Sequence, residues 1–118
     1  MYVATKGDEL STIAEIADAY GISKNHLMKV VHELGQRGYL ETIRGKNGGL
    51  RLMRKPAQIN VGKVVRETDD EMAVVGCMSE KNYCRVENVC ILRRAFSKAT
   101  QAFLSVLDEY TLEDLIKP

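Results

Sequence analysis

The sequence predicts a mostly α-helical fold that carries one small β-hairpin, and three observations lead to that prediction. Residues that cap helices precede several amphipathic stretches in the first half of the chain. A glycine-rich turn separates two short apolar runs, which is typical of a hairpin. In the last third, apolar residues recur at helical spacing over a long stretch.

Length and composition indicate one compact domain overall. With 118 residues, of which 45% are hydrophobic and 28% charged, the chain has the composition of a folded soluble protein. It shows neither an apolar run of the ~20 residues that span a bilayer nor a secretory signal, so we expect a cytoplasmic protein. An odd number of cysteines, three, also favours a reducing compartment over a disulfide scaffold.

The first two helices are marked by the glycines that end them. Residues 1–6 have the pattern of a last helical turn, which Gly7 can stop. Thr12 and Glu15 then form a capping-box pattern at the start of a short helix that ends at Gly21. The apolar stripe of this helix is Ile13, Ile16, Ala17 and Tyr20.

A longer helix follows, capped by Ser23 and ended by Gly38. Its apolar residues recur at offsets 0, 3, 4 and 7, which predicts a buried face of Leu27, Val30, Val31 and Leu34. The exposed residues near its start are then Ser23, Lys24, Asn25, His26 and Lys29. Two helices joined by a glycine turn are the parts of a helix-turn-helix, whose second helix reads the major groove of DNA.

Two residues of this helix have side chains suited to base edges. Asn25 can pair bidentately with adenine, and a lysine such as Lys24 can contact guanine or phosphate. His26 and His32 are six apart, which is not the spacing of neighbours on one helix face. We therefore expect these histidines to meet DNA or solvent and not a metal ion.

A basic hairpin is predicted after the second helix. Residues 39–43 and 50–53 read as strands joined by RGKNGG, in which Asn47-Gly48 signals a tight turn. Residues 24–55 hold eight Lys or Arg against two Asp or Glu, and the cations on and around the tip are Arg44, Lys46, Arg51 and Arg54. This order of elements predicts a winged helix-turn-helix that binds DNA over residues 1–66; the alternative is an ordinary helical pair with a charged surface.

Residues 67–118 are predicted to hold the cysteines and a dimerisation helix. Before them, Asn60 caps a short helix with an inward face of Val61, Val64 and Val65. A long helix runs from about residue 89 to 107, and the 3-4 spacing of its apolar residues predicts a coiled-coil seam of Val89, Leu92, Phe96, Ala99, Phe103 and Val106. This narrow seam favours a homodimer over packing within one chain. The tail, TLEDLIKP, predicts one or two further capped helical turns.

The three cysteines, Cys77, Cys84 and Cys90, stand within fourteen residues. They lack the C-x-x-C pairs and the fourth ligand of a structural zinc site, and no histidine lies nearby to activate a nucleophile, so we expect no enzyme. Three thiolates suit an iron–sulfur cluster whose remaining iron has another ligand and can bind a small diatomic molecule. A zinc or thiol-switch regulator and three unliganded thiols are the alternatives.

Together, these motifs resemble a known family. ISKNH, RGKNGG, GKVVRE, the three cysteines and YTLEDL are similar to the Rrf2-type winged-helix regulators over nearly the whole chain, and within them to the repressors that sense nitric oxide. The resemblance implies a homodimer that represses nitrosative-stress genes from a pseudo-palindromic site on double-stranded DNA. It also implies that the cysteines hold an iron–sulfur cluster, with four irons favoured and two as the alternative.

Two features separate this chain from the full family pattern. Family members begin with a further helix that supplies a carboxylate ligand from across the dimer, and this sequence begins after that point; Asp8 and Glu9 are the nearest acidic residues. Relatives that regulate iron–sulfur cluster biogenesis have a histidine three residues after the last cysteine, where this chain has Arg93. The second difference favours a nitric-oxide sensor over a redox or iron–sulfur-status regulator, which is the alternative.

Overall fold

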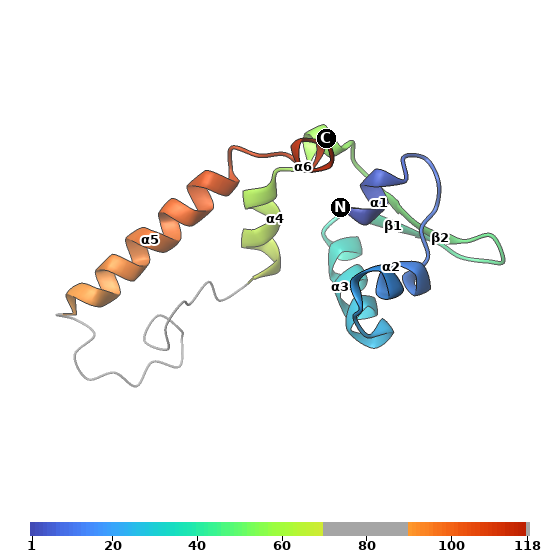
Figure 1. Cartoon of the computed structure of the whole chain (residues 1–118), viewed down its shortest axis with the longest axis horizontal. Coiled ribbons are helices and arrows are strands. Elements are labelled where there is room, and N and C mark those ends of the chain that lie inside the picture. Colours follow the sequence, from blue (N-terminus) through green and yellow to red (C-terminus); the bar gives the residue numbers. More distant parts are fainter. Residues whose placement is uncertain (70–89, 118) are drawn as a thin grey trace. The chain divides into compact units, whose positions relative to one another are not determined.

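The computed structural model describes residues 1–69 and 90–117 of the chain (Figure 1). In chain order the elements are α1 (Tyr2–Thr5), α2 (Ile13–Tyr20), α3 (Lys24–Gln36), β1 (Leu40–Ile43), β2 (Gly49–Leu52), the 3₁₀ helix η1 (Pro56–Gln58), α4 (Val61–Thr68), α5 (Ile91–Leu107) and α6 (Leu112–Ile116). Two compact units result: Met1–Ile59 with Thr111–Pro118, and Asn60–Tyr110. The predicted mostly helical fold with one hairpin is confirmed.

Most of the helix starts predicted from capping residues are confirmed. Four caps accept a hydrogen bond from the backbone N–H three residues further on, namely Thr12, Ser23, Asn60 and Thr111. The N–H groups at a helix start have no partner within the helix, so each cap satisfies one of them. Gly21 ends α2 with φ +64°, a left-handed conformation that glycine adopts without steric cost.

The first unit has one core, shared by three helices and the hairpin. Its buried members are Val3, Ile16, Ala17, Leu27, Val31, Leu40 and Leu50. On α3 the predicted inward residues Leu27 and Val31 are buried and Leu34 packs against them. Val30 was predicted to be buried and this is wrong, because it is 37% exposed at the edge of the packed face. Periodicity gives the direction of the face but not its width.

The hairpin is antiparallel, with register from Leu40↔Leu52 to Ile43↔Gly49. Residues 44–48 therefore form a five-residue connection within the predicted RGKNGG segment. The tight turn in it runs from Gly45 to Gly48, so its central residues are Lys46 and Asn47, one position before the Asn47-Gly48 pair that signalled it. The left-handed residue is Gly45, at φ +111°, whose carbonyl accepts from the Gly48 N–H at 3.0 Å. Gly48 is required for space, because a Cβ there would meet the Ile43 carbonyl oxygen.

A backbone bridge that the sequence did not predict joins the segment before α2 to the hairpin. Ser11 and Leu50 exchange two hydrogen bonds, with N···O distances of 3.0 and 2.6 Å. Ser11 has no exposed surface, and Gly49 beside it leaves no room for a Cβ, which would lie 2.7 Å from the Ser11 carbonyl oxygen. The pairing fixes the base of the hairpin on the helical core.

In the second unit α4 packs against α5 near the C-terminal end of α5. The Arg66 guanidinium binds both carboxylate oxygens of Asp108, with Nη2 to Oδ2 at 2.8 Å. The Asn60 side chain donates to the Asp108 carbonyl at 2.7 Å. Bidentate Arg–carboxylate pairs are the geometrically strong form of ion pair, so this junction fixes one end of the two-helix unit.

We expect the free energy of unfolding to decrease as the pH falls below about 4. The hydrogen bond from Arg66 holds the pKa of Asp108 below its usual value, and hydrogen bonds from Thr111 do the same to the pKa of Asp114. A carboxyl with a lowered folded-state pKa adds stability above its unfolded pKa of about 3.9, and this stability is lost as the pH falls through the folded pKa.

Urea unfolding followed between about pH 5 and pH 2 measures this dependence. In an Asp108→Asn, Asp114→Asn double variant, stability should be lower at neutral pH and should fall less steeply with acid. If the stability of the double variant fell with acid as steeply as that of the parent chain, other titrating groups would be responsible for the pH dependence.

Candidate nucleic-acid interface

The turn between α2 and α3 has the geometry that a helix-turn-helix needs. The Ile22 N–H donates to the Ala17 carbonyl at 3.1 Å, and the left-handed Gly21 lets the chain reverse within three residues. Ser23 then caps α3 through the His26 N–H at 3.1 Å. Ala17 is buried in the same core cluster as Leu27 and Val31 of α3, as expected for a small residue between two packed helices.

The structure brings the predicted contact residues of α3 together at its N-terminal end. Lys24, Asn25, His26 and Lys29 are all exposed, as is His32 one turn further on. Ser23 is also exposed, but its hydroxyl already accepts the capping hydrogen bond. The unpaired N–H groups at a helix start favour phosphate, so the start of α3 suits a polyanion.

The four cations predicted around the hairpin tip divide into two groups. Arg44 and Lys46 lie in the connection itself and are exposed. Arg51 lies within β2, where its Nε donates to the carboxylate of Glu41 at 2.7 Å. This hydrogen bond raises the pKa of Arg51, so the guanidinium stays charged while part of its charge is balanced by Glu41. The tip therefore presents two cations with a third, paired one behind them; Figure 1 shows the tip projecting beyond the helices of its unit.

Arg54 does not lie at the tip. It follows β2 at the base of the hairpin, where its guanidinium stacks 4.7 Å from the centre of the Tyr39 ring. One of its nitrogens donates to the Arg37 carbonyl at 3.4 Å. These contacts tie the hairpin to the end of α3, which is a structural role.

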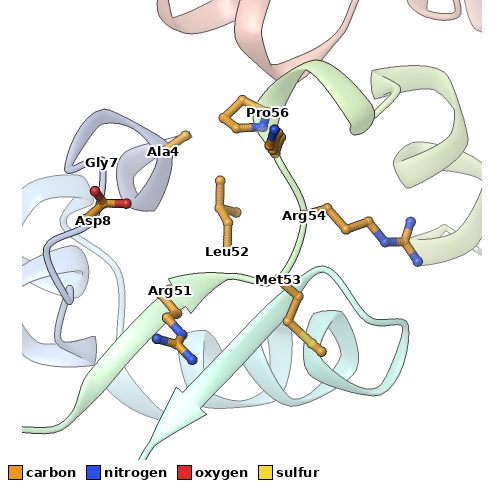
Figure 2. Close-up of a pocket in the computed structure, with 9 residues that line it drawn as sticks. Ala4, Gly7, Asp8, Arg51, Leu52, Met53, Arg54 and Pro56 are labelled. Atoms are coloured by element: carbon orange, nitrogen blue, oxygen red, sulfur yellow. The ribbon is translucent and has the colours of Figure 1, made fainter.

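A cavity of about 550 Å³ lies between α1 and the end of β2 (Figure 2). Its lining residues are Ala4, Gly7, Asp8, Arg51, Leu52, Met53, Arg54, Lys55 and Pro56. Figure 2 shows Leu52 at the centre of the group of lining residues and Arg54 directed away from them. Two of its cations, Arg51 and Arg54, already have partners outside the cavity. We therefore assign the lining residues a structural role at the base of the hairpin and not a role in ligand binding.

One exposed residue of α3 was missed by the sequence reasoning. Met28 is 54% exposed, although apolar residues in an amphipathic helix are usually assigned to the core. Its place one position after Leu27 and three before Val31, off the buried row, was the signal that could have identified it.

Of the three predicted metal ligands, Cys77 and Cys84 lie outside the described residues, as does Val89 of the predicted seam. Cys90 is a half-buried free thiol at the N-cap of α5, whose first N–H groups receive no side-chain cap from it. The start of a 17-residue helix favours a negative group, so this position suits a thiolate ligand. In residues 1–69 and 90–117 no three His, Cys, Asp or Glu side chains group closely enough to hold a metal ion.

Within the same ranges, no helix has the length and apolar character of a membrane span.

Known proteins similar to this chain fit the geometry of the helix-turn-helix and hairpin. The model of a family described as Rrf2, iron-dependent transcriptional regulator, matches residues 1–118. The HTH-type transcriptional regulator NsrR of Bacillus licheniformis is 52% identical over 98% of this chain and 82% of its own length. That of Bacillus subtilis is 52% identical over 97% of this chain and 79% of its own.

Solved structures show the same fold. CymR, the global cysteine regulator of B. subtilis, matches with a TM-score of 0.72 and 27% identity over 97% of this chain and 84% of its own. T. potens IscR matches with a TM-score of 0.70 and 23% identity over 96% of this chain and 74% of its own. The resemblance indicated by the sequence motifs is confirmed.

Proposed function

We propose that this chain, which belongs to the Rrf2 family of iron-dependent transcriptional regulators, is a homodimeric repressor that senses nitric oxide. It is a DNA-binding transcriptional regulator and not an enzyme, as the sequence predicted. The observation that carries the finer proposal is the 52% identity to NsrR along nearly the entire chain. The genes it controls would be those for nitrosative-stress defence.

The DNA-binding part in this proposal is residues 1–66, and the sensing and dimerisation part is residues 67–118. The exposed start of α3 enters the major groove, with Ser23, Lys24, Asn25, His26 and Lys29 as the contact residues. Arg44, Lys46 and Arg51 of the hairpin contact the neighbouring backbone. Support comes from the joint exposure of these residues in one unit and from the basic charge of that segment.

Dimerisation in this proposal uses α5. In a single chain no residue of α5 is buried, and the seam residues Leu92, Phe103 and Val106 are 62, 54 and 52% exposed. Of the other predicted seam residues in the described range, Ala99 is exposed and Phe96 is half-buried. Thr100, Leu104 and Leu107 on the adjacent face are also half-buried. A second copy would cover the exposed stripe and place two α3 helices about 34–36 Å apart on a pseudo-palindromic site.

The cofactor in this proposal is an iron–sulfur cluster held by Cys77, Cys84 and Cys90. When bound, such a cluster supplies iron that combines with nitric oxide. Cys90 immediately precedes α5, and the Arg66–Asp108 pair holds the other end of that helix against α4. Loss of the cluster from the Cys90 thiolate would therefore move the start of α5, because the far end of this helix is held by the Arg66–Asp108 pair. In this proposal a movement of α5 alters the dimer, since α5 forms the dimer interface. A nearly complete switch in DNA binding needs a differential affinity of ~5.5 kcal/mol.

The test is a visible absorption spectrum of protein purified without oxygen, recorded with operator binding as nitric oxide is added stepwise. We expect a broad thiolate-to-iron absorption that decreases together with DNA affinity. Cys84→Ala should lose both the absorption and the response to nitric oxide while keeping the far-ultraviolet circular dichroism of a folded chain.

Two outcomes would contradict the proposal in different ways. Cys84→Ala protein that retained the absorption and the response would reject the ligand set. Colourless parent protein that bound zinc, or that responded only to thiol oxidants, would favour the thiol-switch regulator on the same DNA-binding fold.

A further inference from the structure

We propose that Met28 is a specificity-determining residue, which contacts the C5-methyl group of a thymine in the major groove. The inference rests on the proposed function, because it takes α3 as the helix that enters the groove. It adds one apolar contact to the polar ones that the sequence predicted.

Met28 is free to make such a contact. The side chain is 54% exposed, and the core of its unit uses Leu27 and Val31 from α3 instead. Residues three and four apart share a helix face, so Met28 lies one turn after Lys24 and one turn before His32, with Asn25 beside it. All of these neighbours are exposed.

The arc formed by Lys24, Asn25, Met28, Lys29 and His32 has one apolar member, Met28. Its other side chains carry donors or charges that suit phosphates and polar base edges. The major-groove edge of a base pair likewise has one apolar group, the methyl of thymine. A flexible thioether can follow that methyl group without a fixed rotamer, as methionine does at irregular apolar surfaces.

A protein partner is the competing explanation for an exposed methionine. Interface cores are depleted in charged residues, and lysines border Met28 at both Lys24 and Lys29. Val30, the other exposed apolar residue of α3, lies on the opposite side of the buried row and does not extend the surface around Met28. The surroundings of Met28 are therefore those of a nucleic-acid surface.

The experiment uses the full chain and a duplex that the chain itself selects from a randomised pool. Each thymine of that duplex is replaced in turn by deoxyuridine, which removes the methyl and keeps every hydrogen-bonding group. Fluorescence anisotropy at constant salt should show about a fourfold loss of affinity at one thymine in each half-site, as expected for one buried methyl. Met28→Ala should bind the thymine and uracil duplexes equally, and Met28→Leu should retain part of the difference.

Two control variants separate the possible failures. Val30→Ala truncates an exposed apolar residue on the same helix and should leave the thymine preference unchanged. Lys24→Ala should weaken binding to both duplexes equally and flatten the dependence of affinity on salt. If Lys24→Ala behaves so but the thymine preference is absent in the parent chain or persists in Met28→Ala, the Met28 proposal is overturned and the DNA-binding function stands. If no duplex is selected, the proposed function itself fails.

Discussion

The Gly62→Ala variant is expected to unfold at a lower temperature than the parent chain, with a loss of about 1–3 kcal/mol, the range for an overpacked interior. Gly62 is buried in the first turn of α4, beneath Asp108. A Cβ at this position would meet the Asp108 carboxylate and would lie 2.9 Å from its backbone nitrogen. The backbone nitrogen of Asp108 cannot rotate away as a side chain can, so α4 and the end of α5 would have to move apart. This movement would also weaken the Arg66–Asp108 ion pair.

Gly35→Ala is the matched control, because Gly35 is also a helical glycine. The nearest atom to a Cβ there is the Leu40 carbonyl oxygen at 3.7 Å, an ordinary contact. Alanine should therefore stabilise α3 by about 0.5–1 kcal/mol through its helix propensity. Thermal unfolding of both variants and of the parent chain measures these differences in stability. If Gly62→Ala were as stable as Gly35→Ala, the contact between α4 and Asp108 would accommodate a Cβ without loss of stability.

The Phe103→Asp variant is expected to be a monomer that binds operator DNA at least ~100-fold more weakly, because two linked half-site contacts become one. Phe103 lies in the middle of the proposed seam and is 54% exposed in the single chain. A carboxylate there would have to be buried without a partner in the dimer, which is strongly unfavourable. Sedimentation velocity measures the oligomeric state, and anisotropy measures the affinity.

Ser105→Asp supplies the control for charge and helix propensity. Ser105 is exposed on α5, two residues from Phe103, and so points to the opposite side of the helix. This variant should remain dimeric and bind DNA as the parent does. A Phe103→Asp chain that sediments as a dimer would place the dimer interface elsewhere.

Local signals in the sequence predicted the helix starts well. Each helix cap accepts a hydrogen bond from the N–H only three residues further on, so a short motif contains both partners. This holds for Thr12, Ser23, Asn60 and Thr111. The hairpin and a tight turn within RGKNGG were also predictable, but the exact position of that turn was not. RGKNGG contains more than one glycine able to take positive φ, and the register that selects Gly45 is set by pairing across the strands.

Contacts between distant parts of the chain were less predictable. The Ser11–Leu50 bridge and the Arg54–Tyr39 stack depend on how the hairpin meets the helices, and no local pattern encodes them. The predicted DNA contacts of α3 rested on helix phase and lie together as expected, whereas Arg54 was grouped with the hairpin tip from its charge alone. Met28 was missed because the prediction for α3 considered the buried row and the polar residues, whereas its position off that row was the sign of its exposure.

Each unit is closed by a backbone hydrogen bond beside the point where the chain passes to the other unit. The Leu112 N–H donates to the Ile59 carbonyl at 2.8 Å, and the Val61 N–H donates to the Tyr110 carbonyl at 3.0 Å. Residues 60–110 are therefore an insertion whose ends meet, and the entropy of closing such a loop grows only slowly with its length. A change in the length of the segment between residues 60 and 110 therefore leaves the hydrogen bond between Ile59 and Leu112, and with it the closure of the first unit, in place.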